Sequence, residues 1–215
     1  MCRLADFRIL TVPGLNNSRP DHWQSRWERF YPAFERVEQA QWDNPELAIW
    51  SSRLDQVLRR STRPTLIVAH SFGCLTTVHR AALDTPNLVG ALLVAPADPD
   101  KFGVAELLRD AALPCPAIVV GSTDDHWMEV DRAAAYADQW GAEFINAGAA
   151  GHINAESDLG DWLFGLVQLQ RLVVAAGAYQ SRLAPQRGKR PDAYSAAPVQ
   201  CPIERHASII KRNSG

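Results

Sequence analysis

Short apolar runs rich in β-branched residues recur through residues 7–178, and stretches of helical periodicity separate them. Two of these runs, residues 66–69 (Leu-Ile-Val-Ala) and 117–120 (Ala-Ile-Val-Val), show no alternation of polar and apolar side chains. A strand without such alternation is covered on both faces, which is typical of a parallel sheet between two helical layers. The alternation of strand and helix therefore predicts an α/β fold, a three-layer sandwich with right-handed crossovers.

The strands are expected at six ranges: 7–12, 36–40, 65–69, 88–95, 117–121 and 143–146. Helices are expected at residues 23–30, from 44–46 (Asn-Pro-Glu, a helix start signal) onward, and at 73–83, 104–110, 131–140 and 157–174. Only residues 96–116 separate the fourth strand from the fifth, which leaves room for one short helix and for no large lid. In such sheets sites form beyond the carboxyl ends of the strands, so the loops that follow strands are the places to search.

Residues 69–73 (Ala-His-Ser-Phe-Gly) connect the third strand to a helix and match a nucleophile elbow, G-x-S-x-G, with alanine at the first small position. The sharp turn lifts the Ser71 hydroxyl above the sheet and brings strand and helix together, so only small side chains fit at positions 69 and 73. The helix start also directs the Phe72 N–H toward a developing oxyanion. We expect the Leu15 N–H, after Gly14 in the loop behind the first strand, to be the second donor.

A serine nucleophile needs a base and an acid that orients the base. Asp124 and Asp125 follow the fifth strand, and His152 lies between the last strand and the last helix, so the chain order is Ser, Asp, His. Ser71 would attack a carbonyl carbon while His152 takes its proton and passes it to the leaving group. From the residues alone either aspartate can be the acid.

Other side chains have a functional and a structural interpretation. His70 can line a pocket or belong to the elbow, and Trp127 can form an apolar wall for an acyl group. His22 and Trp23 fit a helix start and core packing better than a substrate site. No His, Cys or Asp cluster has the spacing of metal ligands, so neither a metal nor a cofactor is expected.

Five segments occur in a fixed order: residues 12–14, 21–27, 69–74, 121–125 and 151–152. Together they resemble the small serine hydrolases related to retinoblastoma-binding protein 9, over roughly residues 7–170. This resemblance implies a compact α/β-hydrolase fold without a large lid and a Ser-Asp-His triad. Its acid would be Asp125, directly before the turn His126-Trp127-Met128; many relatives have proline where this chain has His126, so Asp124 stays the alternative.

Charge and composition exclude several classes of protein. The net charge of −2 and the pI near 6.3 lack the basic signature of a nucleic-acid binder, and no apolar run approaches the ~20 residues of a membrane helix. The four cysteines are widely scattered, without the spacing of a zinc site or disulfide framework. We therefore expect a cytoplasmic protein that binds neither nucleic acid nor membrane.

The charge is unevenly distributed. Residues 179–215 contain seven Lys/Arg, two acids and four prolines, a net charge of +5, whereas residues 1–178 carry −7. We expect a hydrolase domain at 1–178 and a disordered basic tail at 179–215, through which an acidic protein partner could bind.

The predicted function is that of a serine hydrolase of the carboxylic-ester class (EC 3.1.1), which cleaves small esters, with amides as a further candidate, through an acyl-enzyme intermediate. The alternative is a hydrolase-like binding or regulatory module with little catalysis. Acyl transfer to an acceptor other than water would use the same residues.

Overall fold

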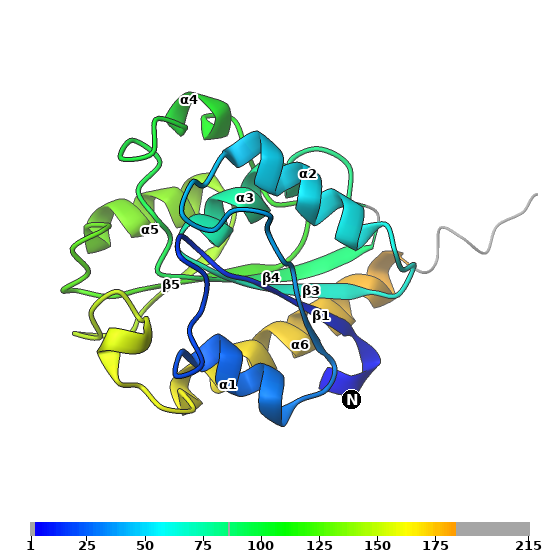
Figure 1. Ribbon diagram of the computed structural model, residues 1–215. Helices are drawn as coiled ribbons and strands as arrows, with labels where there is room; N and C mark the ends of the chain where they lie inside the picture. The colour runs from blue at the N-terminus through cyan, green and yellow to red at the C-terminus, as the bar shows by residue number, and fades with distance from the viewer. Residues whose placement is uncertain (1–2, 86, 184–215) are drawn as a thin grey trace, which may run out of the picture.

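Six parallel strands form a single sheet in the computed structural model, which describes residues 3–85 and 87–183 (Figure 1). The strands are β1 Arg8–Val12, β2 Phe34–Arg36, β3 Thr65–His70, β4 Leu88–Val94, β5 Ala117–Gly121 and β6 Glu143–Asn146. Their order across the sheet is β2-β1-β3-β4-β5-β6, and every neighbouring pair is parallel. The order reverses at β1, because β2 lies on one side of it and β3 on the other, and the crevice of such a sheet opens at that point.

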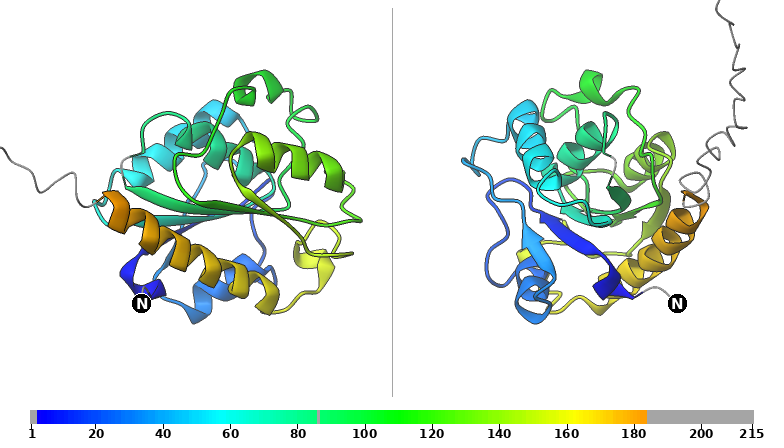
Figure 2. Two further views of the ribbon diagram at one scale, coloured as in Figure 1. Left: turned by 180° about the vertical axis from the view of Figure 1, so that it is seen from behind. Right: turned by 90° about the vertical axis from the view of Figure 1, so that its right-hand side faces the viewer.

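Helices cover both faces of the sheet, as expected for a three-layer α/β fold. They are α1 Trp23–Phe30, α2 Leu47–Leu58, α3 Phe72–Ala81, α4 Ala105–Leu108, α5 Val130–Gln139 and α6 Leu163–Leu183. Short 3₁₀ turns add η1 Leu4–Asp6 and η2 Ala155–Ser157. Helices α1 and α6 lie on one face, and α2, α3 and α5 lie on the other (Figures 1 and 2).

The double cover explains the uninterrupted apolar run in β3. Leu66 and Val68 pack into the core beneath α1 and α6, whereas Ile67 and Ala69 pack into the core on the α2–α3 side. All four side chains are fully buried. Alternate residues of one strand thus supply two separate cores, so no position remains for a polar side chain.

The second strand was predicted at 36–40, which is wrong: it is Phe34–Arg36 at the sheet edge. Glu35 and Arg36 pair with Leu10 and Thr11 of β1, although their composition is not strand-like. Their charges are satisfied locally, since Arg36 forms an ion pair with Glu28 and Glu35 pairs with Arg8. An edge strand accepts such charged side chains, and local propensity therefore misplaced it.

The last helix is also displaced from its predicted range, 157–174. It runs from Leu163 to Leu183, and residues before it form η2 and a turn in which Asp158, Gly160 and Trp162 all have positive φ. Trp162 is buried in the core on this face, and seating its indole requires the break.

The helix passes the expected domain boundary at residue 178. Residues 179–183 are helical, and the Tyr179 hydroxyl donates to the Pro114 carbonyl at 2.7 Å. The rest of the expected basic tail, 184–215, lies outside the described residues. At the N-terminal side of the fold, the helix at 23–30 is confirmed, but Phe30 is 58% exposed, so its core stripe consists of Trp23 and Trp27 alone.

No lid covers the sheet edge within the described residues, because the segment between β4 and β5 contains only α4. None of the helices in residues 3–85 and 87–183 combines the length and the apolar character needed to cross a bilayer.

Candidate active site

A sharp turn between β3 and α3 presents the Ser71 side chain. Its backbone has φ 53° and ψ −124°, a strained conformation for a residue with a side chain. Gly73 makes the turn possible, because a Cβ at this position would lie 2.1 Å from the Val12 carbonyl oxygen. Strand and helix therefore approach as closely as the elbow motif predicts, with Ala69 fully buried on the strand side.

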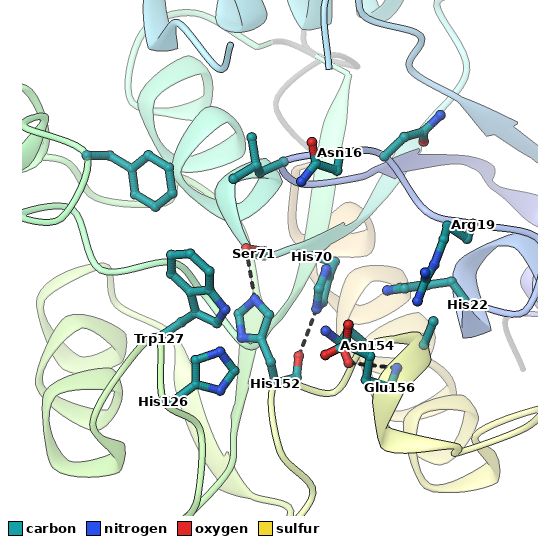
Figure 3. Close-up of a pocket in the computed structure, with 14 residues that line it drawn as sticks. Asn16, Arg19, His22, His70, Ser71, His126, Trp127, His152, Asn154 and Glu156 are labelled. Atoms are coloured by element: carbon teal, nitrogen blue, oxygen red, sulfur yellow. Dashed lines mark hydrogen bonds between the residues drawn. The ribbon is translucent and has the colours of Figure 1, made fainter. Parts of the chain in front are cut away.

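Three side chains from three different loops form a hydrogen-bonded chain. His152 Nε2 lies 3.0 Å from Ser71 Oγ, and His152 Nδ1 lies 2.9 and 3.0 Å from the two carboxylate oxygens of Asp125 (Figure 3 shows the serine and the histidine). The Asp125 side chain is only 2% exposed and also accepts the Trp127 N–H at 2.9 Å. The arrangement can move a proton from the serine hydroxyl to the imidazole while the carboxylate fixes the other ring nitrogen.

Asp124, the alternative acid, points to a different set of groups. Its Oδ1 accepts the Ser122 hydroxyl at 2.8 Å and the Gly151 N–H at 2.7 Å. These two hydrogen bonds hold the pKa of the Asp124 carboxyl below its usual range. The carboxylate thus ties the loop after β5 to the loop that carries His152, a role that no pattern in the sequence indicated.

Two backbone N–H groups beside Ser71 have no hydrogen-bond acceptor in the described part of the chain: those of Leu15 and Phe72. Gly14 brings their two segments together. A Cβ on Gly14 would lie 2.7 Å from Ser71 Cβ and 3.1 Å from the Phe72 nitrogen. The loop that carries the Leu15 N–H thus runs directly past Ser71 and Phe72.

His70 supports the backbone of the neighbouring histidine. Its Nε2 donates to the His152 carbonyl oxygen at 2.9 Å, and the two ring centroids are 4.9 Å apart. Burial holds the pKa of the His70 imidazole well below its usual value, so the ring is neutral near pH 7. His70 also lines the pocket, as expected.

His22 begins α1, as the sequence suggested. Its Nδ1 accepts the Gln24 N–H at 3.2 Å, and burial, followed by the nearby Arg36 charge, lowers the His22 pKa to about 3. Its neighbour Trp23 has a role that sequence reasoning missed, because the indole Nε1 donates to the Ile153 carbonyl at 2.8 Å. Helix α1 thereby holds the residue next to His152.

A cavity of about 340 Å³ opens above Ser71 and His152. Trp127 and Phe102 form an aromatic wall, with ring centroids 6.4 Å apart, and the Trp127 ring lies 6.0 Å from that of His152. The predicted apolar position of Trp127 thus borders the site (Figure 3), while Phe102, in the loop after β4, had no sequence signal. Within the described residues no group of three or more His, Cys, Asp or Glu side chains could hold a metal ion.

Comparison with known proteins identifies the family and the fold of the chain. The sequence matches the serine hydrolase family over residues 9–171. A YdeN-like hydrolase from Pectobacterium atrosepticum is 34% identical, with a TM-score of 0.76, over 81% of this chain and 93% of that one.

More distant structures share the fold. The ydeN gene product of B. subtilis is 17% identical, with a TM-score of 0.61, over 76% of this chain and 97% of that one. An esterase from a Rhodococcus species is 15% identical, with a TM-score of 0.60, over 82% and 93% of the two chains. No curated protein matches the chain.

Proposed function

The chain belongs to the serine hydrolase family, and on that basis we propose that it hydrolyses small carboxylic esters through Ser71, His152 and Asp125. One observation carries the proposal: a serine hydroxyl in a strained elbow lies 3.0 Å from an imidazole whose other nitrogen lies 2.9 Å from a buried carboxylate. A serine without such a base is a poor nucleophile.

In the proposed reaction Ser71 Oγ forms a bond to the ester carbonyl carbon while His152 Nε2 accepts the hydroxyl proton. The carbonyl oxygen becomes an oxyanion, held by the N–H groups of Leu15 and Phe72. His152 then protonates the departing alcohol oxygen as the carbon–oxygen bond breaks, which leaves an acyl-enzyme. The same imidazole then accepts a proton from water as the water oxygen attacks the acyl carbon. The bond between that carbon and Ser71 Oγ breaks while His152 returns the proton to Oγ, which releases the carboxylic acid and free Ser71.

We propose esters rather than amides, the EC 3.1.1 class, because no lid covers the cavity within the described residues, and an open site readily admits activated acyl substrates. We also propose that the protein is a relative of the small hydrolases related to retinoblastoma-binding protein 9, supported by the ordered motifs of the sequence. A cytoplasmic location is proposed too, in keeping with two free buried cysteines, Cys74 and Cys115.

The test combines covalent labelling with turnover. Wild-type protein should react with a fluorophosphonate probe at Ser71 and hydrolyse 4-nitrophenyl butyrate. Ser71→Ala should lose both, and His152→Ala should lower kcat/KM by ~10³-fold or more, since base catalysis is typically worth ~10²–10⁴ and the nucleophile also loses its activation.

The matched control is Ser52→Ala on the exposed face of α2. This variant should react with the fluorophosphonate probe and hydrolyse 4-nitrophenyl butyrate as the wild type does. Labelling that persists in Ser71→Ala, or a wild-type protein inert toward both reagents, would contradict the proposed function.

A further inference from the structure

The cavity has two chemically different sides around Ser71 and His152. Trp127 and His126 lie on one side, whereas Arg19, His22, Asn154 and Glu156 lie on the other (Figure 3). The aromatic wall of Trp127 and Phe102 faces apolar parts of a substrate, whereas the opposite side offers mostly polar groups, with Ala155 between Asn154 and Glu156. Which atoms of these groups remain available determines what they can bind.

Two asparagines that line the cavity, Asn17 and Asn154, have their oxygens occupied. Asn17 Oδ1 accepts the Ser18 N–H at 2.7 Å and a hydrogen bond from Arg36 Nη1 at 3.0 Å. Asn154 Oδ1 accepts the Glu156 N–H at 3.0 Å as the cap of η2. Within the described residues the NH₂ groups of these two amides donate no hydrogen bond, so they are available as donors to a ligand.

His22 contributes a further donor. Because Nδ1 accepts the Gln24 N–H, the single proton of the neutral ring is on Nε2. The His22 side chain is 4% exposed, and Nε2 is buried without a hydrogen-bond partner in the described part of the chain. An unmet buried donor is costly, so a ligand oxygen at this inner end of the cavity would supply what the free protein lacks.

The charges of this side are one cation and one anion. Arg19 reaches only Asp21, at 4.0 Å and with both side chains about two-thirds exposed, a pairing worth little in water. Among the described residues Glu156 is the one carboxylate that lines the cavity. The three neutral donors (Asn17, Asn154 and His22) and the Arg19 guanidinium thus outnumber this single carboxylate.

We propose that this side of the cavity is a carboxylate subsite and that the natural substrates are small esters with a free carboxylate a few bonds from the scissile carbonyl. The carboxylate accepts from Arg19, the Asn17 and Asn154 amides and His22, while the apolar part of the substrate contacts Trp127 and Phe102. This inference rests on the proposed function, since it assigns a substrate class to the same cavity.

Two ester pairs test it, each differing by one carboxylate. Mono-4-nitrophenyl glutarate is compared with 4-nitrophenyl butyrate, which places the charge on the acyl side, and 4-acetoxybenzoate with phenyl acetate, which places it on the alcohol side. At low ionic strength the wild type should favour the carboxylate ester of at least one pair by about tenfold in kcat/KM, the effect of one charge-assisted hydrogen bond.

Arg19→Gln should remove most of the preference for the carboxylate ester, mainly by raising its KM. Glu156→Gln should increase the preference, because it removes a negative charge that repels the substrate carboxylate. Added salt should weaken the preference in wild type. Arg59→Gln is the matched control. Arg59 directly follows α2, near the amino ends of the strands and away from the cavity, and its side chain is 57% exposed. The preference for the carboxylate ester should therefore not change in this variant.

The subsite is refuted if neither pair shows a preference, if Arg19→Gln lowers kcat/KM for both esters of a pair equally, or if an ammonium-bearing ester is preferred. Fluorophosphonate labelling separates the two levels. If the protein labels at Ser71 but shows no preference for carboxylate esters, only the subsite is contradicted. If it does not label, the proposed function is contradicted as well.

Discussion

Two adjacent carboxylates at the end of β5 have different environments, although they are the same residue type. Asp125 is buried against His152 Nδ1 and the Trp127 N–H, whereas Asp124 binds the Ser122 hydroxyl and the Gly151 N–H. The first can fix the tautomer of the imidazole, and the second fixes the loop on which the imidazole is carried.

We therefore expect Asp125→Asn to reduce kcat by about 10⁴-fold, as expected when the orienting carboxylate becomes an amide. Asp124→Asn should retain more than a tenth of wild-type kcat/KM, because a neutral amide oxygen still accepts from Ser122. Steady-state hydrolysis of 4-nitrophenyl butyrate compares the two variants. A larger loss in Asp124→Asn than in Asp125→Asn would reverse the assignment.

At this scale the residue pattern alone predicted the serine and the histidine and left the two aspartates open, and only the family resemblance implied Asp125. Chain order and the elbow motif predicted Ser71 and His152, since both depend on a local pattern beside a strand. Adjacent aspartates share that pattern, and only the side-chain directions of the loop distinguish them. Arg19 and Phe102 had no local signal, because they reach the cavity through tertiary packing alone.

At the scale of the elements, the contact between β1 and α3 leaves no space for a side chain at residue 73. A methyl group there would lie 2.1 Å from the Val12 carbonyl oxygen and 2.6 Å from that of Pro13, and neither backbone group can move without disturbing the sheet. The turn that presents the nucleophile thus requires glycine at position 73.

Gly73→Ala should lower the free energy of unfolding by about 3 kcal/mol, at the upper end for overpacking, and should reduce hydrolysis with it. Urea titration followed by circular dichroism measures the loss. Gly103→Ala is the control, since it has positive φ but no atom within 4 Å, so only backbone strain of about 1 kcal/mol is expected. Equal losses in the two variants would refute the packing explanation.

Strands buried on both faces, such as β3 and β5, were predicted almost to the residue, whereas the edge strand β2 and the start of α6 were misplaced. A buried strand must be apolar throughout, so its composition reveals it. Edge strand β2 is held by ion pairs between Arg36 and Glu28 and between Arg8 and Glu35, and the pattern of apolar residues reveals neither of them. The turn before α6 depends on where the Trp162 indole packs.

At the scale of the whole molecule, three loops from β3, β5 and β6 meet at one edge of the sheet. That convergence was predictable, because all parallel strands end on the same side. It also buries two imidazoles, His22 and His70, next to the site, and burial lowers the pKa of both. Their neutral forms are part of the folded state.

Acid should therefore destabilise the protein. In the unfolded chain these imidazoles bind protons below about pH 6.5, while the folded chain does not, so stability is complete above that pH and falls toward the lowered pKa values. For His22, whose pKa is lowered to about 3, the loss of unfolding free energy between pH 6.5 and 5 should be about 2 kcal/mol.

His22→Asn should remove the contribution of one imidazole to this loss of unfolding free energy, because asparagine preserves the helix cap but does not titrate. Urea titrations at several pH values test the slope. A pH dependence that is identical in wild type and variant would show that His22 is not buried in its neutral form.

The closeness of the Trp127 ring to His152, 6.0 Å between centroids, has a consequence for how turnover can be watched. A positively charged imidazole quenches the fluorescence of an indole beside it. Each time the base holds the proton of the nucleophile, this tryptophan should dim, and it should brighten when the proton leaves. Subtracting the signal of a Trp127→Phe protein would isolate that one emitter from the other indoles, so the proton's position becomes an optical signal that needs no added dye.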